Sequence, residues 1–230
     1  MPGYRAESDL ERAVATKPAL LEGLRWGKPR KGHPEGSVGR HVADLLHRLD
    51  RADENSDSRY EPAGRRVSLD VDAVQRARSD EATARHASPD EATARRASPD
   101  EGAARRADFR LIALVHDSFK YQVRDWRPKR GENHHAMRAR RFAERFTDDE
   151  RLLSTIELHD RPYAIWRRLR RTGRVDEEQL ETMLASLPDF DLFLHFVELD
   201  GSAEGKAQEP VAWLRDELSR RGMETGAKRF

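Results

Sequence analysis

The stretch Phe109-Arg-Leu-Ile-Ala-Leu-Val-His-Asp117 is the part of the sequence that decides the fold. Its large apolar residues are distributed nearly all round a helix, which is typical of a buried central helix, and the pattern predicts this helix over residues 108–121. His116 and Asp117 would then lie inside the helix. Two adjacent ionisable groups are costly in such surroundings unless they are paired or bound to a metal. The stretch therefore predicts a buried helix that carries a candidate metal-binding dipeptide.

The regions on either side of this stretch carry apolar residues at helical spacing. Further helices are expected over residues 8–25 with an interruption at Pro18, 37–50, 132–146, 149–170 with a break near Pro162, 176–200 around Pro188, and 209–221. No stretch shows sustained strand alternation between turn signals. The fold class should therefore be all-α, and residues 1–230 should form a single helical domain.

A ten-residue repeat occupies residues 70–109. Its units begin with acidic residues and are rich in alanine and arginine, and they span Asp70–Ser79 (degenerate), Asp80–Pro89, Asp90–Pro99 and Asp100–Phe109. Each Ser-Pro-Asp-Glu joint is typical of a helix start. Alanine is almost the only apolar residue of the units, so they cannot bury enough surface to offset the entropy of ordering. We therefore expect an exposed, partly helical or disordered insertion that, with a linker, interrupts the domain at about residues 51–107.

The composition limits the possible partners and ligands. The sequence has no cysteine, so a bound metal would need histidine, aspartate or glutamate. Its 43 basic and 42 acidic residues give a formal net charge of +1, which does not indicate nucleic-acid binding. Arginines cluster in residues 138–141 and 167–171; a solvated helix face is the simpler interpretation, and an anionic substrate or nucleic acid is the alternative. No apolar run has the length of a membrane span and no signal peptide is evident, so we expect a cytoplasmic protein without membrane contact.

Several further residues are candidate metal ligands because they fall on the expected helices or at their ends: His41, His135, His159 and Asp200. Imidazole and carboxylate together suit Mn, Fe, Co, Ni or Zn. His134 is an alternative to His135 as a ligand. His47 and His195 are expected to be packed or exposed on the surface, without a role in metal binding.

The order of these residues resembles the sequence motif of a known family. His41, then His116-Asp117, then Asp200 is similar to the H…HD…D signature of the HD-domain superfamily. The local sequences support the resemblance at Gly32–Gly36, which is similar to the lead-in of HD domains attached to bacterial tRNA nucleotidyltransferases, and at Leu114–Lys120, His135–Ala139, Glu157–Asp160 and Leu199–Ser202. The resemblance covers roughly residues 20–220 and skips the repeat. It implies an HD-domain helical bundle with a low-complexity repeat insertion.

The resemblance also implies the chemistry. It implies a metal-dependent phosphohydrolase that acts on a nucleotide or another small phosphate ester with one or two divalent ions. One metal would be bound by His41, His116, Asp117 and Asp200, and Asp117 would bridge to a second metal bound by His135 and His159. Lys120 would contact phosphate or orient Asp117, which makes these two the expected catalytic residues. Asp160 would be a ligand or a partner of His159.

Outside the family motif, Arg124 and Arg161 are candidate phosphate contacts. Two other functions stay open at this point. The presence of both His135 and His159 is compatible with a di-iron oxygenase of the same superfamily, and an HD site can also bind metal and nucleotide as a regulatory module without turnover. The sequence makes no prediction of the oligomeric state.

Overall fold

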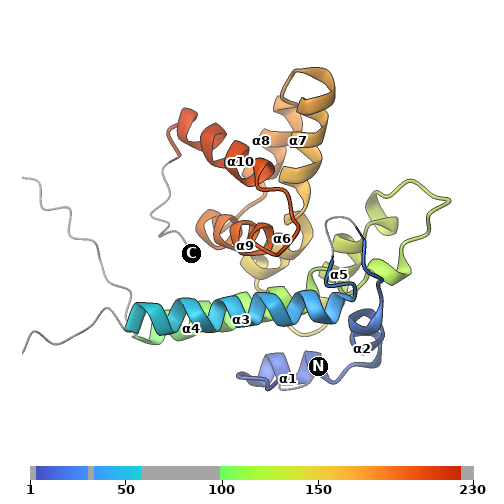
Figure 1. Cartoon of the computed structure of the whole chain (residues 1–230), viewed down its shortest axis with the longest axis vertical. Helices are drawn as coiled ribbons and strands as arrows, with labels where there is room; N and C mark the ends of the chain where they lie inside the picture. Colours follow the sequence, from blue (N-terminus) through green and yellow to red (C-terminus); the bar gives the residue numbers. More distant parts are fainter. Residues whose placement is uncertain (1–3, 31–33, 58–98, 224–230) are drawn as a thin grey trace, which may run out of the picture.

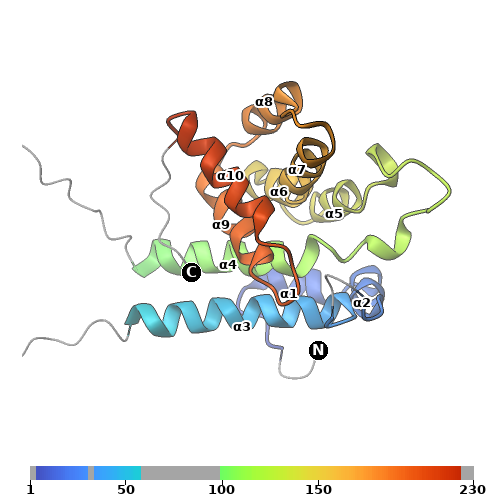
Figure 2. The same cartoon turned by 45° about the horizontal axis from the view of Figure 1, so that its top comes forward.

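Two long antiparallel helices, α3 (Val38–Asp57) and α4 (Pro99–Val115), lie side by side (Figures 1 and 2). The computed structural model describes residues 4–30, 34–57 and 99–223 of the chain. Within these ranges the secondary structure is helical and no β-strand occurs, so the predicted all-α class is confirmed. None of the helices described is both long and apolar enough to cross a membrane.

The shorter helices on the N-terminal side of the fold are α1 (Asp9–Ala15) and α2 (Pro18–Arg25). Those that follow α4 in the chain are α5 (His135–Ala143), α6 (Glu150–Leu158), α7 (Arg161–Thr172), α8 (Glu177–Ala185), α9 (Phe190–Gly201) and α10 (Glu209–Arg220), with short 3-10 turns η2 (Lys120–Gln122) and η3 (Gly131–Asn133) between α4 and α5. Of the shorter helices, α1, α2, α6 and α9 pack on the pair of α3 and α4, and the others pack on α6, on α9 or on one another.

The predicted interruptions fall where proline or a capping residue begins a new helix. Pro18 lies in the first turn of α2 and Pro162 in the first turn of α7, where the missing N–H of proline costs no helical hydrogen bond. Asp189, directly after Pro188, accepts a hydrogen bond from the N–H of Leu192 and so caps α9. The breaks expected near these prolines are therefore confirmed.

The expected bounds of the central helix were wrong at both ends. α4 spans Pro99–Val115 instead of 108–121, so the last repeat unit, Asp100–Phe109, forms its first half. Alanine and arginine are good helix formers, and tertiary contacts supply what the unit lacks in apolar surface: Phe109 is buried, and Arg106 pairs with Glu7 and Asp50.

The bounds of the insertion change accordingly. α3 continues to Asp57, so the linker and insertion expected over residues 51–107 are too wide at both ends. The earlier repeat units lie outside the described residues. The same is true of His86, which belongs to one of these units, and of His33.

The helices enclose two adjacent apolar cores. The first lies between α3 and α4 and the helices packed on them, and its members include Val42, Leu45, Ile112 and Phe196. The second lies between α7, α8, α10 and the opposite side of α9. Because α9 contributes to both cores, Asp200 in its last turn is held firmly beside α3 and α4.

We expect the segment between α3 and α4 to be dispensable for folding. Replacing residues 58–98 with a short Gly/Ser linker should leave thermal unfolding and metal content unchanged, because both core helices stay complete. Extending the replacement to residue 106 should lower the melting temperature, because it removes half of α4 and the ion pairs of Arg106. Equal melting temperatures of the two variants would contradict the assignment of residues 99–106 to the core.

Candidate metal centre

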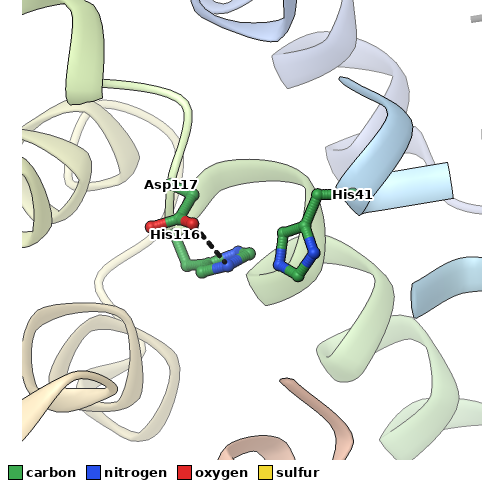
Figure 3. Close-up of side chains that lie close together, drawn as sticks. All are labelled: His41, His116 and Asp117. Carbon is green, nitrogen blue, oxygen red and sulfur yellow. Dashed lines mark ion pairs between the residues drawn. The ribbon is translucent and has the colours of Figure 1, made fainter. Parts of the chain in front are cut away.

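His41, His116 and Asp117 meet at one point of the first core (Figure 3). His41 lies in the first turn of α3, and His116 and Asp117 follow directly after α4 in a turn, not inside a helix as expected. One ligand atom from each residue lies within 4.8 Å of the others, and all three side chains are buried. The helix end therefore lets two neighbouring residues converge on one site, which consecutive positions on a helix, about 100° apart, do less readily.

Asp200 reaches the same group from α9. Its Oδ1 atom lies 2.9 Å from Nε2 of His41 and 3.5 Å from Nε2 of His116. The four residues that the resemblance assigned to one metal are therefore close together, although they come from three separate parts of the chain: α3, the turn after α4, and α9.

Asp117 also belongs to a second group with His135 and His159. Its Oδ1 atom lies 3.2 Å from Nε2 of His135, in the first turn of α5, and 3.5 Å from Nε2 of His159, at the end of α6. The two ring nitrogens lie 3.4 Å apart. All six expected metal ligands thus lie in two groups that share Asp117.

The two neighbouring histidines, His134 and His135, face different carboxylates. His135 lies beside Asp117, whereas Nε2 of His134 lies 3.3 Å from Oδ2 of Asp160. His134, His135 and Asp160 form a third, more exposed group that could hold a cation. Asp160 is therefore placed as a partner of His134, at the edge of the second group.

Hydrogen bonds orient the two deepest histidines for metal binding. Nδ1 of His116 donates to the carbonyl of Ala113 at 2.9 Å, and Nδ1 of His159 donates to the carbonyl of Ile156 at 2.8 Å. Each bond turns Nε2 toward the centre, as backbone carbonyls do for metal-binding histidines. Within the described residues, Nε2 of His116 and Oδ1 of Asp117 are buried and make no hydrogen bond of ordinary geometry, although other polar atoms of the centre lie 3.2–3.5 Å from them. Buried polar atoms are rarely left so, and a divalent cation would satisfy both.

The pKa values fit a site for cations. Burial lowers the pKa of His116 to about 4, so its ring is a neutral donor at physiological pH. Burial also opposes protonation of His159, but the carboxylates of Asp117 and Asp160 outweigh it and raise its pKa. The carboxylates therefore create a potential that favours positive charge beside His159, where a metal ion could replace the proton.

Two lysines stabilise the carboxylates of the centre. Lys120 contacts Oδ2 of Asp117, and Lys206, in the loop after α9, contacts Oδ1 of Asp200. Burial opposes ionisation of both carboxyls, but the lysines and the nearby histidines hold the pKa of each well below its ordinary value. Lys206 was missed from the sequence, because a lysine six residues after Asp200 in an irregular loop follows no helical spacing.

The remaining sequence candidates lie elsewhere. His47 is exposed on α3, and His195 packs on Phe109 with Arg105 at its Nδ1 atom. Arg124 lies over the ring of Trp126, and Arg161 is exposed at the start of α7. His47 and His195 therefore lie outside the three His/Asp groups of the described structure.

A glycine of α2, Gly23, lets the turn after α4 pack directly against α2. A Cβ atom at Gly23 would lie 1.6 Å from the backbone oxygen of Ser118. We expect Gly23→Ala to destabilise the fold by at least about 1–3 kcal/mol, the usual cost of overpacking, and to weaken metal binding by displacing the turn. Gly102→Ala is the matched control: a Cβ there meets nothing within 4 Å, so the change should be neutral or stabilise α4. Urea unfolding and metal titration of both variants check this, and an unaffected Gly23→Ala protein would contradict the packing described.

No protein-family model, curated protein or solved structure matches the chain. The function is therefore inferred from the residues of the centre and their geometry.

Proposed function

We propose that the chain is a metal-dependent phosphohydrolase of the HD-domain kind, acting on a nucleotide or another small phosphate ester. The observation that carries the proposal is the carboxylate of Asp117. Its Oδ2 atom lies 3.5 Å from His116, and its Oδ1 atom faces His135 and His159. One carboxylate oxygen thus faces each histidine group, which is the arrangement that a bridging ligand between two cations requires.

The donor set supports divalent ions of the Mn, Fe, Co, Ni or Zn class, because imidazole nitrogens and carboxylate oxygens dominate it. Bound in pairs, such ions neutralise the oxygens of a phosphoryl group and lower the pKa of water. His41, His116 and Asp200 would hold one ion with Asp117, and His135 and His159 would hold the other.

Lys120 is best explained as a positioning residue. Its ammonium group contacts Oδ2 of Asp117 and so leaves Oδ1 directed at His135 and His159. Its side chain is about four-fifths buried (21% exposed), which fits a structural contact better than a direct grip on substrate. Of the two roles expected for Lys120, orienting Asp117 is therefore the one we propose.

The proposal predicts oxygen-independent release of phosphate. The purified chain, supplied with Mn²⁺ or Co²⁺ under anaerobic conditions, should release inorganic phosphate from at least one member of a nucleoside monophosphate panel. Chelation should abolish the release and restored metal should recover it, because the bound ions would supply the charge stabilisation that the reaction needs.

The same assay separates the two rival functions. A di-iron oxygenase, which the pairing of His135 with His159 also permits, would act only with iron and would consume oxygen in step with product. A regulatory module would bind nucleotide in a metal-dependent way with no turnover under any condition. Either result would overturn the hydrolase proposal.

A further inference from the structure

The two arginine clusters of the sequence have different surroundings in the structure. Arg140 pairs with Glu144, Glu150 and Glu157, and Arg141 pairs with Glu132, so two of the three arginines in the first cluster are neutralised. The third, Arg138, donates to Gln122. In the second cluster, at the end of α7, Arg168 pairs with Asp176, and within the described ranges no carboxylate pairs with the other arginines of residues 167–171. α7 therefore presents positive charge that the fold itself does not use.

Aromatic rings share the exposed face of α7 with these arginines. Tyr163, Trp166, Arg167 and Arg170 are spaced three, four and seven residues from the first, which places them along one side of the helix. The rings of Tyr163 and Trp166 are stacked with centroids 6.0 Å apart. Arg167 lies 5.7 Å from the ring of Tyr163, and Arg170 lies 6.0 Å from that of Trp166. One side of α7 therefore carries two aromatic rings with an arginine guanidinium near each of them.

A second group of the same kind lies in the loop between η2 and η3. Trp126 is 72% exposed, and the guanidinium groups of Arg124 and Arg127 lie 5.7 and 4.5 Å from its ring centroid. Asn133 holds the loop in place by bonding both the N–H and the carbonyl of Arg124, each at 2.9 Å. The carboxylate of Asp125 in this loop forms an ion pair with Lys129, so it does not neutralise either arginine.

Both groups adjoin the edge of the candidate metal centre. The loop leads through Asn133 directly into His134, and α7 begins directly after Asp160. His134 and Asp160 contact each other, so the near ends of the two segments meet beside His135. The far end of α7 lies about 18 Å away, at 1.5 Å per helical residue.

We infer that the loop of residues 124–130 and the aromatic face of α7 bind a single-stranded nucleic acid. Exposed rings offer stacking surfaces to unpaired bases, and unpaired arginines attract the phosphates between them. A mononucleotide could use one ring, whereas two separate ring and arginine groups suit a strand of several nucleotides. The inference concerns binding, and it stands whether or not the centre hydrolyses phosphate esters. DNA and RNA share the chemistry involved, and the test includes both.

The test is fluorescence anisotropy with labelled oligothymidylate and oligouridylate of about 20 nucleotides, a length that spans the usual site sizes. The full chain is titrated without added metal, so that the probe stays intact. Trp126→Ala and Tyr163→Ala should each weaken binding about fivefold or more, the effect of losing one base–aromatic stack. The double variant Arg167→Gln/Arg170→Gln should reduce the slope of log affinity against log salt by about 1.4.

Matched controls come from elsewhere on the surface. Trp26 is 40% exposed and has Arg30 at 5.8 Å from its ring, but it lies at the end of α2 and belongs to neither binding segment. Arg51 is an exposed arginine on α3. Trp26→Ala and Arg51→Gln should leave the affinity unchanged. Absence of binding, binding unaffected by the two aromatic variants, equal competition by polyglutamate, or tighter binding of a duplex of the same length would each overturn the inference.

Discussion

Asp117→Asn should abolish metal binding and phosphate release while leaving the fold intact. Asparagine keeps the shape of the side chain but loses the charge that faces His116 on one side and His135 and His159 on the other. We expect Mn²⁺ affinity to fall by more than about 100-fold, beyond the 10- to 100-fold that loss of an outer-shell partner costs. Calorimetric titration and elemental analysis measure the metal, and circular dichroism checks the fold.

The matched control is Asp108→Asn. Asp108 is partly buried on α4 and pairs with Arg151, away from the histidine groups, so its loss should change metal content little. Full metal occupancy in Asp117→Asn would show that Asp117 is not a ligand. Loss of metal in both variants would point instead to general damage of α4.

The second large effect is expected outside the centre, at a buried ion pair between α1 and α4. Glu11 and Arg110 are almost fully buried, and two guanidinium nitrogens of Arg110 reach the two carboxylate oxygens of Glu11 at 3.0 and 3.2 Å. Arg110 also donates to the carbonyl of Arg5, and Glu11 accepts from Tyr4 and from the N–H of Glu7. The pair therefore fastens the first residues of the described chain to the central helix.

Glu11→Ala should lower the free energy of unfolding by about 3 kcal/mol, the lower end of the range for breaking a buried pair, because Glu7 still faces Arg110 at 2.9 Å. For a chain of this size that corresponds to a fall of about 6–12 °C in melting temperature. The exposed pair of Arg12 and Asp9 on the same helix is the control, and Arg12→Ala should cost less than about 1 kcal/mol. The double variant Glu11→Leu/Arg110→Met should recover much of the loss, since apolar residues can replace a buried pair. A double variant as unstable as Glu11→Ala would contradict the electrostatic explanation.

The local features of this fold could be predicted from the sequence because their causes are local. Prolines in a first turn and capping aspartates mark where a new helix begins, so the breaks near Pro18, Pro162 and Pro188 were predictable. The C-terminal end of α4 was not, because no glycine or proline marks it. Apolar periodicity continues through Val115, and Ser118 and Phe119 are themselves buried, so the pattern looks helical where the chain turns.

The candidate ligands could be proposed from their order in the sequence, but their contacts with other residues could not. Histidine and aspartate are conspicuous in apolar segments, whereas the contacts of Lys206 with Asp200 and of His134 with Asp160 depend on how separate helices meet. The same holds for Arg106, which the repeat made look like one of many exposed arginines. Its carboxylate partners, Glu7 and Asp50, lie far away in the sequence.

The last repeat unit has a consequence for how this chain can change in length. Residues 100–109 form the first half of α4, and the preceding repeat units have nearly the same sequence. A tandem duplication or loss of one whole unit upstream would therefore leave the sequence of α4 unaltered from its first residue. Copy number between Asp57 and Pro99 could thus drift in steps of ten residues without shifting the register of His116 and Asp117 against the histidines that face them.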